Sequence, residues 1–163
     1  MRVGGNSASL SRRNVVTLPN GFRWIREDDA SVKFKCDEPR MDRYSLYDYY
    51  CWSLEADSLV IVQDVEGSLV GVLQLTIHKN YLTIEMVARN KLFNYPGVGL
   101  NLIKVVELYV APQLRIREVR LEALQELVPY YDDTLGYHEY IAAYYDEAWG
   151  YLTPKRKFLA SAA

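Results

Sequence analysis

Residues 84–103 read IEMVARNKLFNYPGVGLNLI, and the interpretation of the whole chain starts from this stretch. Its first part is an apolar run typical of a strand, and its last part is apolar at helical spacing. The loop between them contains Gly97 and Gly99. A helix that opens in this way has free N–H groups in its first turn, and its dipole attracts negative charge. Spacing alone predicts either an anion site or a glycine turn that only lets the helix pack closely on a sheet.

The segments before this stretch predict strands joined by short turns. Alternating or β-branched apolar residues favour strands at 22–26, 59–63, 69–78 and 81–88. The last three are separated by only a few residues each, so they should form an antiparallel meander. Aromatic residues at helical spacing favour a helix from Met41 to Leu54, either continuous or broken in two.

The segments after the loop alternate between helix and strand. A long helix is expected at 98–110 with Pro112 as its stop, then a strand around 119–123 and a short helix that includes Tyr130 to Asp133. Gly136 suits a left-handed cap, and strands are expected at 137–144 and 149–158. The fold class is therefore α/β of the α+β type, with a mixed, mostly antiparallel sheet of six to seven strands flanked by helices.

Composition favours one soluble domain. The chain has 163 residues and a net charge of −2, with 19 basic and 21 acidic residues interspersed along it. Residues 1–15 are expected to be a flexible leader and 16–163 the folded domain. Nucleic acid is not expected as a partner because no basic cluster stands out. No run approaches the ~20 apolar residues that span a bilayer, so no membrane partner is expected.

The cysteines and histidines do not suggest a metal site. Cys36 and Cys51 lack metal-ligand spacing, and His78 and His138 lie far along the chain. With no secretory leader, reduced thiols and a cytoplasmic location are expected.

Two blocks resemble the GNAT acyltransferase superfamily. In that family a strand leads to a loop reading Arg or Gln, two residues, Gly, one residue, Gly or Ala, and Asn94, Gly97 and Gly99 fall on those positions. Asn94 departs from the usual Arg or Gln. The later VPYYDDTLGY is similar to the family's aromatic, Tyr and Leu-Gly-aromatic signature. The resemblance covers roughly residues 59–140 and implies a GNAT-like fold and an N-acetyltransferase that uses acetyl-CoA as co-substrate.

The resemblance also implies a set of binding residues for acetyl-CoA. The strand before the loop would pair with the pantetheine arm, and the loop and first helical turn would hold the pyrophosphate. These positions are Met86, Val87, Ala88, Asn94, Tyr95, Pro96, Gly97, Val98, Gly99 and Leu100.

Direct attack of a primary amine on the thioester needs an acid and a base. The family tyrosine that protonates the departing thiolate maps onto Tyr131, although one extra residue before Leu135 leaves Tyr130 as the alternative, because a one-residue slip turns a helical side chain by ~100°. Glu85 is the candidate base, since it interrupts an apolar run and burial would raise its pKa. It could instead face solvent beside Thr83. His78 is a second candidate base, although a lone histidine at a strand end is more often a surface residue.

Other functions are compatible with parts of the pattern. A non-catalytic acyl-CoA-binding module of the same fold would explain Asn94 and the extra residue. A dinucleotide-binding unit fits less well, because the strands before the loop are hairpins rather than parallel crossovers. The acceptor, a small-molecule or peptide amine, is not identified by any motif, and the aromatic C-terminal strands make a homodimer reasonable.

Overall fold

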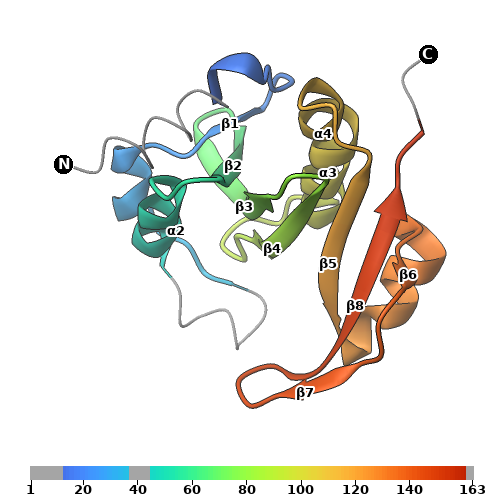
Figure 1. The fold of residues 1–163 in the computed structure, drawn as a ribbon. Coiled ribbons are helices and arrows are strands. Elements are labelled where there is room, and N and C mark those ends of the chain that lie inside the picture. Colours follow the sequence, from blue (N-terminus) through green and yellow to red (C-terminus); the bar gives the residue numbers. More distant parts are fainter. Residues whose placement is uncertain (1–12, 37–44, 161–163) are drawn as a thin grey trace.

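One twisted sheet forms the centre of the molecule (Figure 1). The computed structural model describes residues 13–36 and 45–160. Its strands are β1 (Phe22–Trp24), β2 (Ser58–Val65), β3 (Ser68–Ile77), β4 (Tyr81–Arg89), β5 (Glu118–Leu124), β6 (His138–Glu139), β7 (Tyr144–Asp146) and β8 (Gly150–Phe158). They lie in the order β1-β2-β3-β4-β5-β8-β6, with β7 also beside β8. Only β4 and β5 are parallel neighbours. The expected mixed, mostly antiparallel sheet is confirmed, with eight strands instead of six or seven.

The additional strand arises because the expected strand 137–144 is interrupted. His138 and Glu139 pair with Arg156 and Lys155 of β8, and the next partner along β8 would be Pro154. Proline has no N–H to donate, so the ladder stops there and only a long bond of 3.4 Å joins the Tyr140 N–H to the Pro154 carbonyl. Pairing resumes at Tyr144 opposite Leu152. The prediction of one continuous strand was therefore wrong.

The helical segments are mostly short. They are η1 (Glu27–Ser31), α2 (Leu46–Ser53), α3 (Val98–Val105), the π-helix η3 (Val106–Val110), α4 (Ala111–Gln113), η4 (Gln125–Leu127) and the π-helix η5 (Tyr130–Leu135). Ser45 caps α2 by accepting a hydrogen bond from the Asp48 N–H, while the Asp48 carboxylate accepts one from the Ser45 N–H. Residues 41–44 of the expected first helix and 1–12 of the expected leader lie outside the described residues, and 13–15 are helical.

The long helix after the loop differs from its prediction at the C-terminal end. It continues through η3 and past Pro112 as far as Gln113. Proline cannot donate to the carbonyl four residues earlier, and the wider turn just before it, in which the Ala111 N–H bonds to Val106, accommodates this lost bond. Pro112 therefore lies inside the helix and does not end it.

Side chains of alternating strand residues form two apolar layers. On one face Leu59, Ile61 and Leu73 pack with Leu102 and Val106 of the long helix. On the other face Val60, Val62 and Val72 pack with Leu46 and Tyr49 of α2. Successive strand residues point to opposite faces, which is why these central strands are apolar at nearly every position. We call these the α3 face and the α2 face.

Gly71 of β3 sets how closely the long helix approaches the sheet. A Cβ atom at this position would lie 2.2 Å from Val98 Cγ1 and 3.0 Å from Leu102 Cδ1. The first turn of α3 therefore rests on the bare backbone of β3. This close contact fixes the position of the loop that precedes α3.

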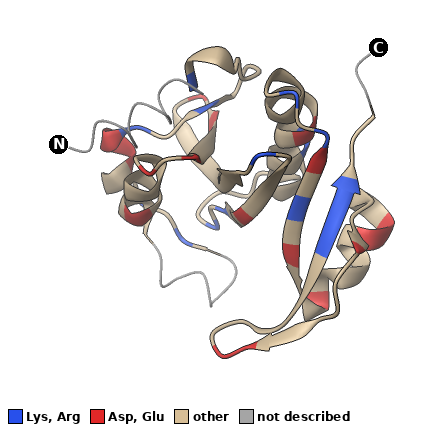
Figure 2. Cartoon of the chain, viewed as in Figure 1, with Lys and Arg blue, Asp and Glu red and all other residues tan. Residues whose placement is uncertain are grey.

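Charges of both signs are intermixed over the elements (Figure 2). The most basic run, Lys155 to Lys157 on β8, lies beside β5, which carries Glu118 and Glu122. Glu107, buried in η3, accepts hydrogen bonds from Tyr137 Oη at 2.8 Å and Lys157 Nζ at 2.9 Å. No helix among the described residues is long and apolar enough to cross a bilayer.

Candidate active site

The parallel strands β4 and β5 separate halfway along their length (Figure 1). They pair only over Tyr81–Ile84 and Glu118–Leu121. Beyond this point β4 stays paired with β3 as far as Arg89, and β5 stays paired with β8 as far as Leu124. The backbone of residues 85–89 therefore has an edge toward β5 that no strand of the described part of the chain occupies. An extended ligand can pair with such an edge as an added strand would.

A bulge in β4 coincides with the separation. Ile84 is opposite Leu75 and Met86 is opposite Gln74, so Glu85 is the extra residue without a partner in β3. A bulge bends its strand and increases the local twist, and this accounts for the divergence of β4 from β5. Met86, Val87 and Ala88, which the sequence predicted as pantetheine-binding, lie on the diverging part.

The loop after β4 leads from this open edge to the start of α3. Gly97 has a φ of 71°, a left-handed conformation that explains its glycine, and its carbonyl accepts the first helical bond from the Asn101 N–H at 2.8 Å. A Cβ at Gly99 would meet nothing within 4 Å. Because close packing of helix on sheet depends on Gly71, the loop glycines are not needed for that purpose, and the space above Gly99 is open to a ligand.

Asn90 anchors the beginning of the loop. Its buried carboxamide accepts from the N–H groups of Lys35 and Leu92, and donates to the carbonyls of Lys33 and Leu69. These four bonds join the loop to the segment after η1 and to β3. Sequence reasoning missed this residue, because a single Asn after a strand has no distinctive pattern.

Tyr131 and Tyr130 have different environments in η5. The side chain of Tyr131 is 8% exposed and packs in the apolar cluster of the α3 face, whereas Tyr130 is 39% exposed. The Tyr131 hydroxyl makes no hydrogen bond among the described residues. Burial, followed by the neighbouring Tyr130, raises the pKa of Tyr131 to about 12. Tyr131 therefore keeps its proton at neutral pH and can donate it.

The π-helical form of η5 explains the extra residue in VPYYDDTLGY. A π-turn contains one residue more than an α-turn, so an insertion can be absorbed without moving the flanking residues off their face. Both Tyr131 and Leu135 are buried, and the Tyr137 N–H bonds to the Tyr131 carbonyl at 2.9 Å. Gly136 has a φ of 77°, so the expected left-handed cap is confirmed.

Glu85 lies on the α2 face at a cavity of about 270 Å³. The cavity is lined by His78, Tyr81, Thr83, Ile84, Glu85, Arg120, Leu121, Glu122 and Tyr140. The Glu85 side chain is exposed as a whole, yet partial desolvation of its carboxyl group raises the pKa of Glu85. The contact with Thr76 opposes this effect and the nearby Glu122 carboxylate adds to it. Glu85 and Thr83 therefore lie on the same polar side of β4, as the alternative interpretation expected. That side of the strand forms one wall of the cavity.

Apart from His78, the charged and aromatic residues of the rest of the cavity wall were not singled out from the sequence. Glu122 accepts a hydrogen bond from Tyr144 Oη at 2.6 Å. The guanidinium of Arg120 lies 3.6 Å from the centre of the Tyr81 ring and bonds to Glu118 at 2.6 Å. His78 stacks on Tyr81 with the ring centres 4.3 Å apart, so its ring is part of this wall. Alternation along β5 puts Arg120 and Glu122 on the same face of the strand, but only the fold brings that face next to Glu85.

Comparisons with known proteins give matches among solved structures only. No protein-family model matches the chain, and no curated protein sequence matches it. The structure of Ard1 from Thermoplasma volcanium matches with a TM-score of 0.63 and 18% identity, over 86% of this chain and 97% of that one. A GCN5-related N-acetyltransferase from Rhodopseudomonas palustris matches with a TM-score of 0.61 and 18% identity, over 88% and 98% of the two chains.

A GNAT family acetyltransferase from Elizabethkingia anophelis, solved with acetyl-CoA bound, matches with a TM-score of 0.56 and 13% identity, over 86% of this chain and all of that one. The chain has the GNAT fold. The fold that the two sequence blocks implied is thereby confirmed.

Within this GNAT fold the candidate residues lie on both faces of the sheet. The open edge at 86–88 and the loop at 94–100 follow one another along the chain. Glu85 lies on the α2 face and Tyr131 on the α3 face. In a continuous sheet, groups on opposite faces cannot reach the same atom, whereas the gap between the diverging strands removes that barrier.

Proposed function

We propose that this protein is an N-acyltransferase that transfers the acetyl group of acetyl-CoA to a primary amine. The proposal rests mainly on one observation, the unpaired edge of β4 that leads directly into a helix start with open space above Gly99. An extended arm ending in phosphates fits this combination, because the arm can pair with the strand edge and the phosphates can accept hydrogen bonds from the free N–H groups of α3. The names of the matched structures support the same class of reaction.

The residues around the separation suit direct transfer. Acetyl-CoA supplies an acetyl thioester. Glu85, as carboxylate, accepts a proton from the amine as the amine nitrogen attacks the thioester carbonyl, and the raised pKa of Glu85 makes it a stronger base. Tyr131 donates its hydroxyl proton to the departing sulfur, and the proton that Glu85 accepted passes through water to the Tyr131 oxygen, which restores both groups. The carboxylates of Glu85 and Glu122 at the cavity favour an acceptor that arrives as an ammonium ion, which releases one proton to water before its nitrogen attacks.

Calorimetry with acetyl-CoA and a turnover assay on a panel of primary amines test this proposal. We expect saturable binding, and a ligand at a hundredfold above its Kd should add about 2.7 kcal/mol to the stability of the folded state. Gly99→Val fills the open space above the loop and should abolish binding, with an unchanged far-ultraviolet circular dichroism spectrum.

Gly99→Ala is the matched control, because a single methyl group leaves most of that space open. Failure of the wild-type protein to bind millimolar acetyl-CoA would refute the proposed function. Binding without turnover on any amine would favour the non-catalytic acyl-CoA-binding module, which the Asn94 departure from the family pattern also suggests.

A further inference from the structure

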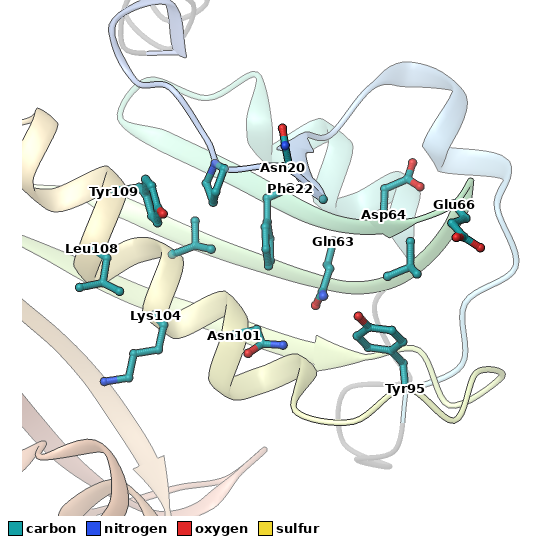
Figure 3. Close-up of a pocket in the computed structure, with 14 residues that line it drawn as sticks. Asn20, Phe22, Gln63, Asp64, Glu66, Tyr95, Asn101, Lys104, Leu108 and Tyr109 are labelled. Carbon is teal, nitrogen blue, oxygen red and sulfur yellow. The ribbon is translucent and has the colours of Figure 1, made fainter.

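A second cavity lies along α3, on the side toward β1 and β2 (Figure 3). This groove has a volume of about 580 Å³, within the range of small-molecule sites. One wall is Phe22 of β1 with the end of β2, and the other is α3 and η3, with Tyr95 of the loop at one end. The separation between β4 and β5 lies beyond β3 and β4, at the other side of the helix. Of the lining residues of the groove, Tyr95 alone also belongs to the candidate acetyl-CoA-binding residues.

Gln63 is an unusual residue for this position. Leu59, Ile61 and Gln63 are the successive residues of β2 that point to the α3 face, so an apolar side chain would be expected there. The residue is 5% exposed, and its Oε1 is buried without a hydrogen-bond partner among the described residues. Such an atom costs folding free energy unless something else bonds to it. Figure 3 shows the amide pointing across the groove toward Asn101.

The facing wall offers a second free amide. The Asn101 side chain makes no hydrogen bond among the described residues either, and it is partly exposed in the groove. Two carboxamides thus face one space with unused donors and acceptors. Phe22, directly opposite Gln63 in the β1–β2 ladder, provides an aromatic wall beside them.

The charges at the groove disfavour an anionic occupant. Asp64 and Glu66 lie at one end, and Asp64 is paired with Arg23 at 3.2 Å. Lys104 is the only cation among the lining residues, and it shares the Glu107 carboxylate, at 3.3 Å, with Lys157. The lining therefore holds two carboxylates and one ammonium group, so a phosphate would meet a net negative charge. An uncharged ligand fits better.

We propose that this groove binds a small, uncharged, planar molecule with a lactam or cyclic amide edge, that is, an N–H donor beside a C=O acceptor. A glutamine amide pairs with such an edge through two parallel hydrogen bonds, as it does with the edge of a nucleobase. The terminal torsion of glutamine is broad, so a rotation turns Oε1 toward the groove. The ring of the ligand packs between Phe22 and the helix.

Titration with 1(2H)-isoquinolinone, a fused-ring lactam, tests the proposal, with binding followed by NMR on the full chain. We expect saturable shifts of the Gln63 and Asn101 side-chain amide signals. Isocoumarin, the lactone with the same fused-ring shape, has a ring oxygen in place of the N–H donor, and should bind at least about tenfold more weakly, the loss expected for a buried hydrogen bond. Equal binding of both compounds, or no binding of the lactam at millimolar concentration, would overturn the proposal.

Gln63→Met keeps the length of the side chain and removes the amide. It should weaken lactam binding about tenfold or more while its Tm stays equal to that of the wild type or rises, because a buried unpaired group is removed. A clear fall in Tm would assign Gln63 to stability and contradict the proposal. Gln74→Met, the same change on the α2 face of β3, should leave lactam binding unchanged. The test needs no acetyl-CoA, so its outcome is independent of the proposed acyltransfer.

Discussion

At the scale of single residues, the buried hydroxyl of Tyr131 carries the clearest prediction. Phenylalanine keeps the ring that packs in the α3-face cluster. Tyr131→Phe should therefore preserve folding and acetyl-CoA affinity, and lower kcat by about 10²–10⁴, the range for losing a general acid. Steady-state kinetics measure the effect, with the exposed Tyr130→Phe as the control that changes kcat little. A large loss at Tyr130 alone would move the acid to that residue, and small losses at both would exclude a tyrosine acid.

Glu85 gives a prediction about pH. A base must be deprotonated, so kcat/KM should fall as pH drops through the raised pKa of Glu85. Glu122→Gln removes a neighbouring negative charge, lowers the pKa of Glu85 and should shift the acid limb of the profile to lower pH. Glu85→Gln should remove that limb and lower kcat. A limb that remains unchanged in Glu85→Gln would assign the base role to another group.

Thermal stability shows whether the kinetic effects of Glu85→Gln come from the lost carboxylate or from unfolding. The pKa of Glu85 is higher in the folded state than in the unfolded state, so the ionised carboxylate lowers the free energy of unfolding. This destabilisation is absent at low pH, where Glu85 is protonated in both states, and is fully present once the pH exceeds the folded-state pKa. Above that pH, Glu85→Gln should therefore not lower Tm.

At the scale of elements, the contact between β3 and α3 predicts a cost for any side chain at position 71. Gly71→Ala should destabilise the fold by about 1–3 kcal/mol, because its Cβ would overlap Val98 Cγ1 at 2.2 Å. Chemical denaturation measures the change. Val98→Ala in the same chain removes the overlapping atom, so the two substitutions together should cost less than the sum of their separate effects. Strict additivity would contradict the contact.

Two helices also show why the local spacing of apolar residues did not predict their exact form. The helix from Val98 and the short helix at Tyr130 were both predicted, but their π-helical parts were not. Apolar residues at i, i+3 and i+4 are compatible with a regular α-helix. Over a few turns they are nearly as compatible with a helix in which one inserted residue forms a π-turn. Which form results depends on the residues that must be buried on either side, here Tyr131 and Leu135.

At the scale of the whole molecule, Glu107 joins parts of the chain that are far apart in sequence. Its carboxylate, 4% exposed, is held by Tyr137, Lys157 and Lys104. Glu107→Leu should lower stability by about 3–5 kcal/mol, since it leaves Lys157 and the Tyr137 hydroxyl without their partner. Tyr137→Phe removes one hydrogen bond to a charged group and should cost less, about 1.5–3 kcal/mol. A loss below about 1 kcal/mol for Glu107→Leu in thermal unfolding would show that the network contributes little.

The sequence by itself determined the order of the main elements, the meander, and the loop with Gly97 and Gly99, because turn residues and apolar period are local properties. The GNAT-like fold followed from the resemblance of two sequence blocks to that family. Tertiary structure alone decided that β4 and β5 separate after Ile84, that Gly71 makes the close approach of α3, and that Gln63 is buried beside a groove. Each of these features depends on which strands become neighbours, and pairing between residues distant in the chain leaves no periodic signal along either partner. The same holds for the cavity beside Glu85, whose wall combines β4 with residues of β5 and Tyr140 that come 35 or more positions later.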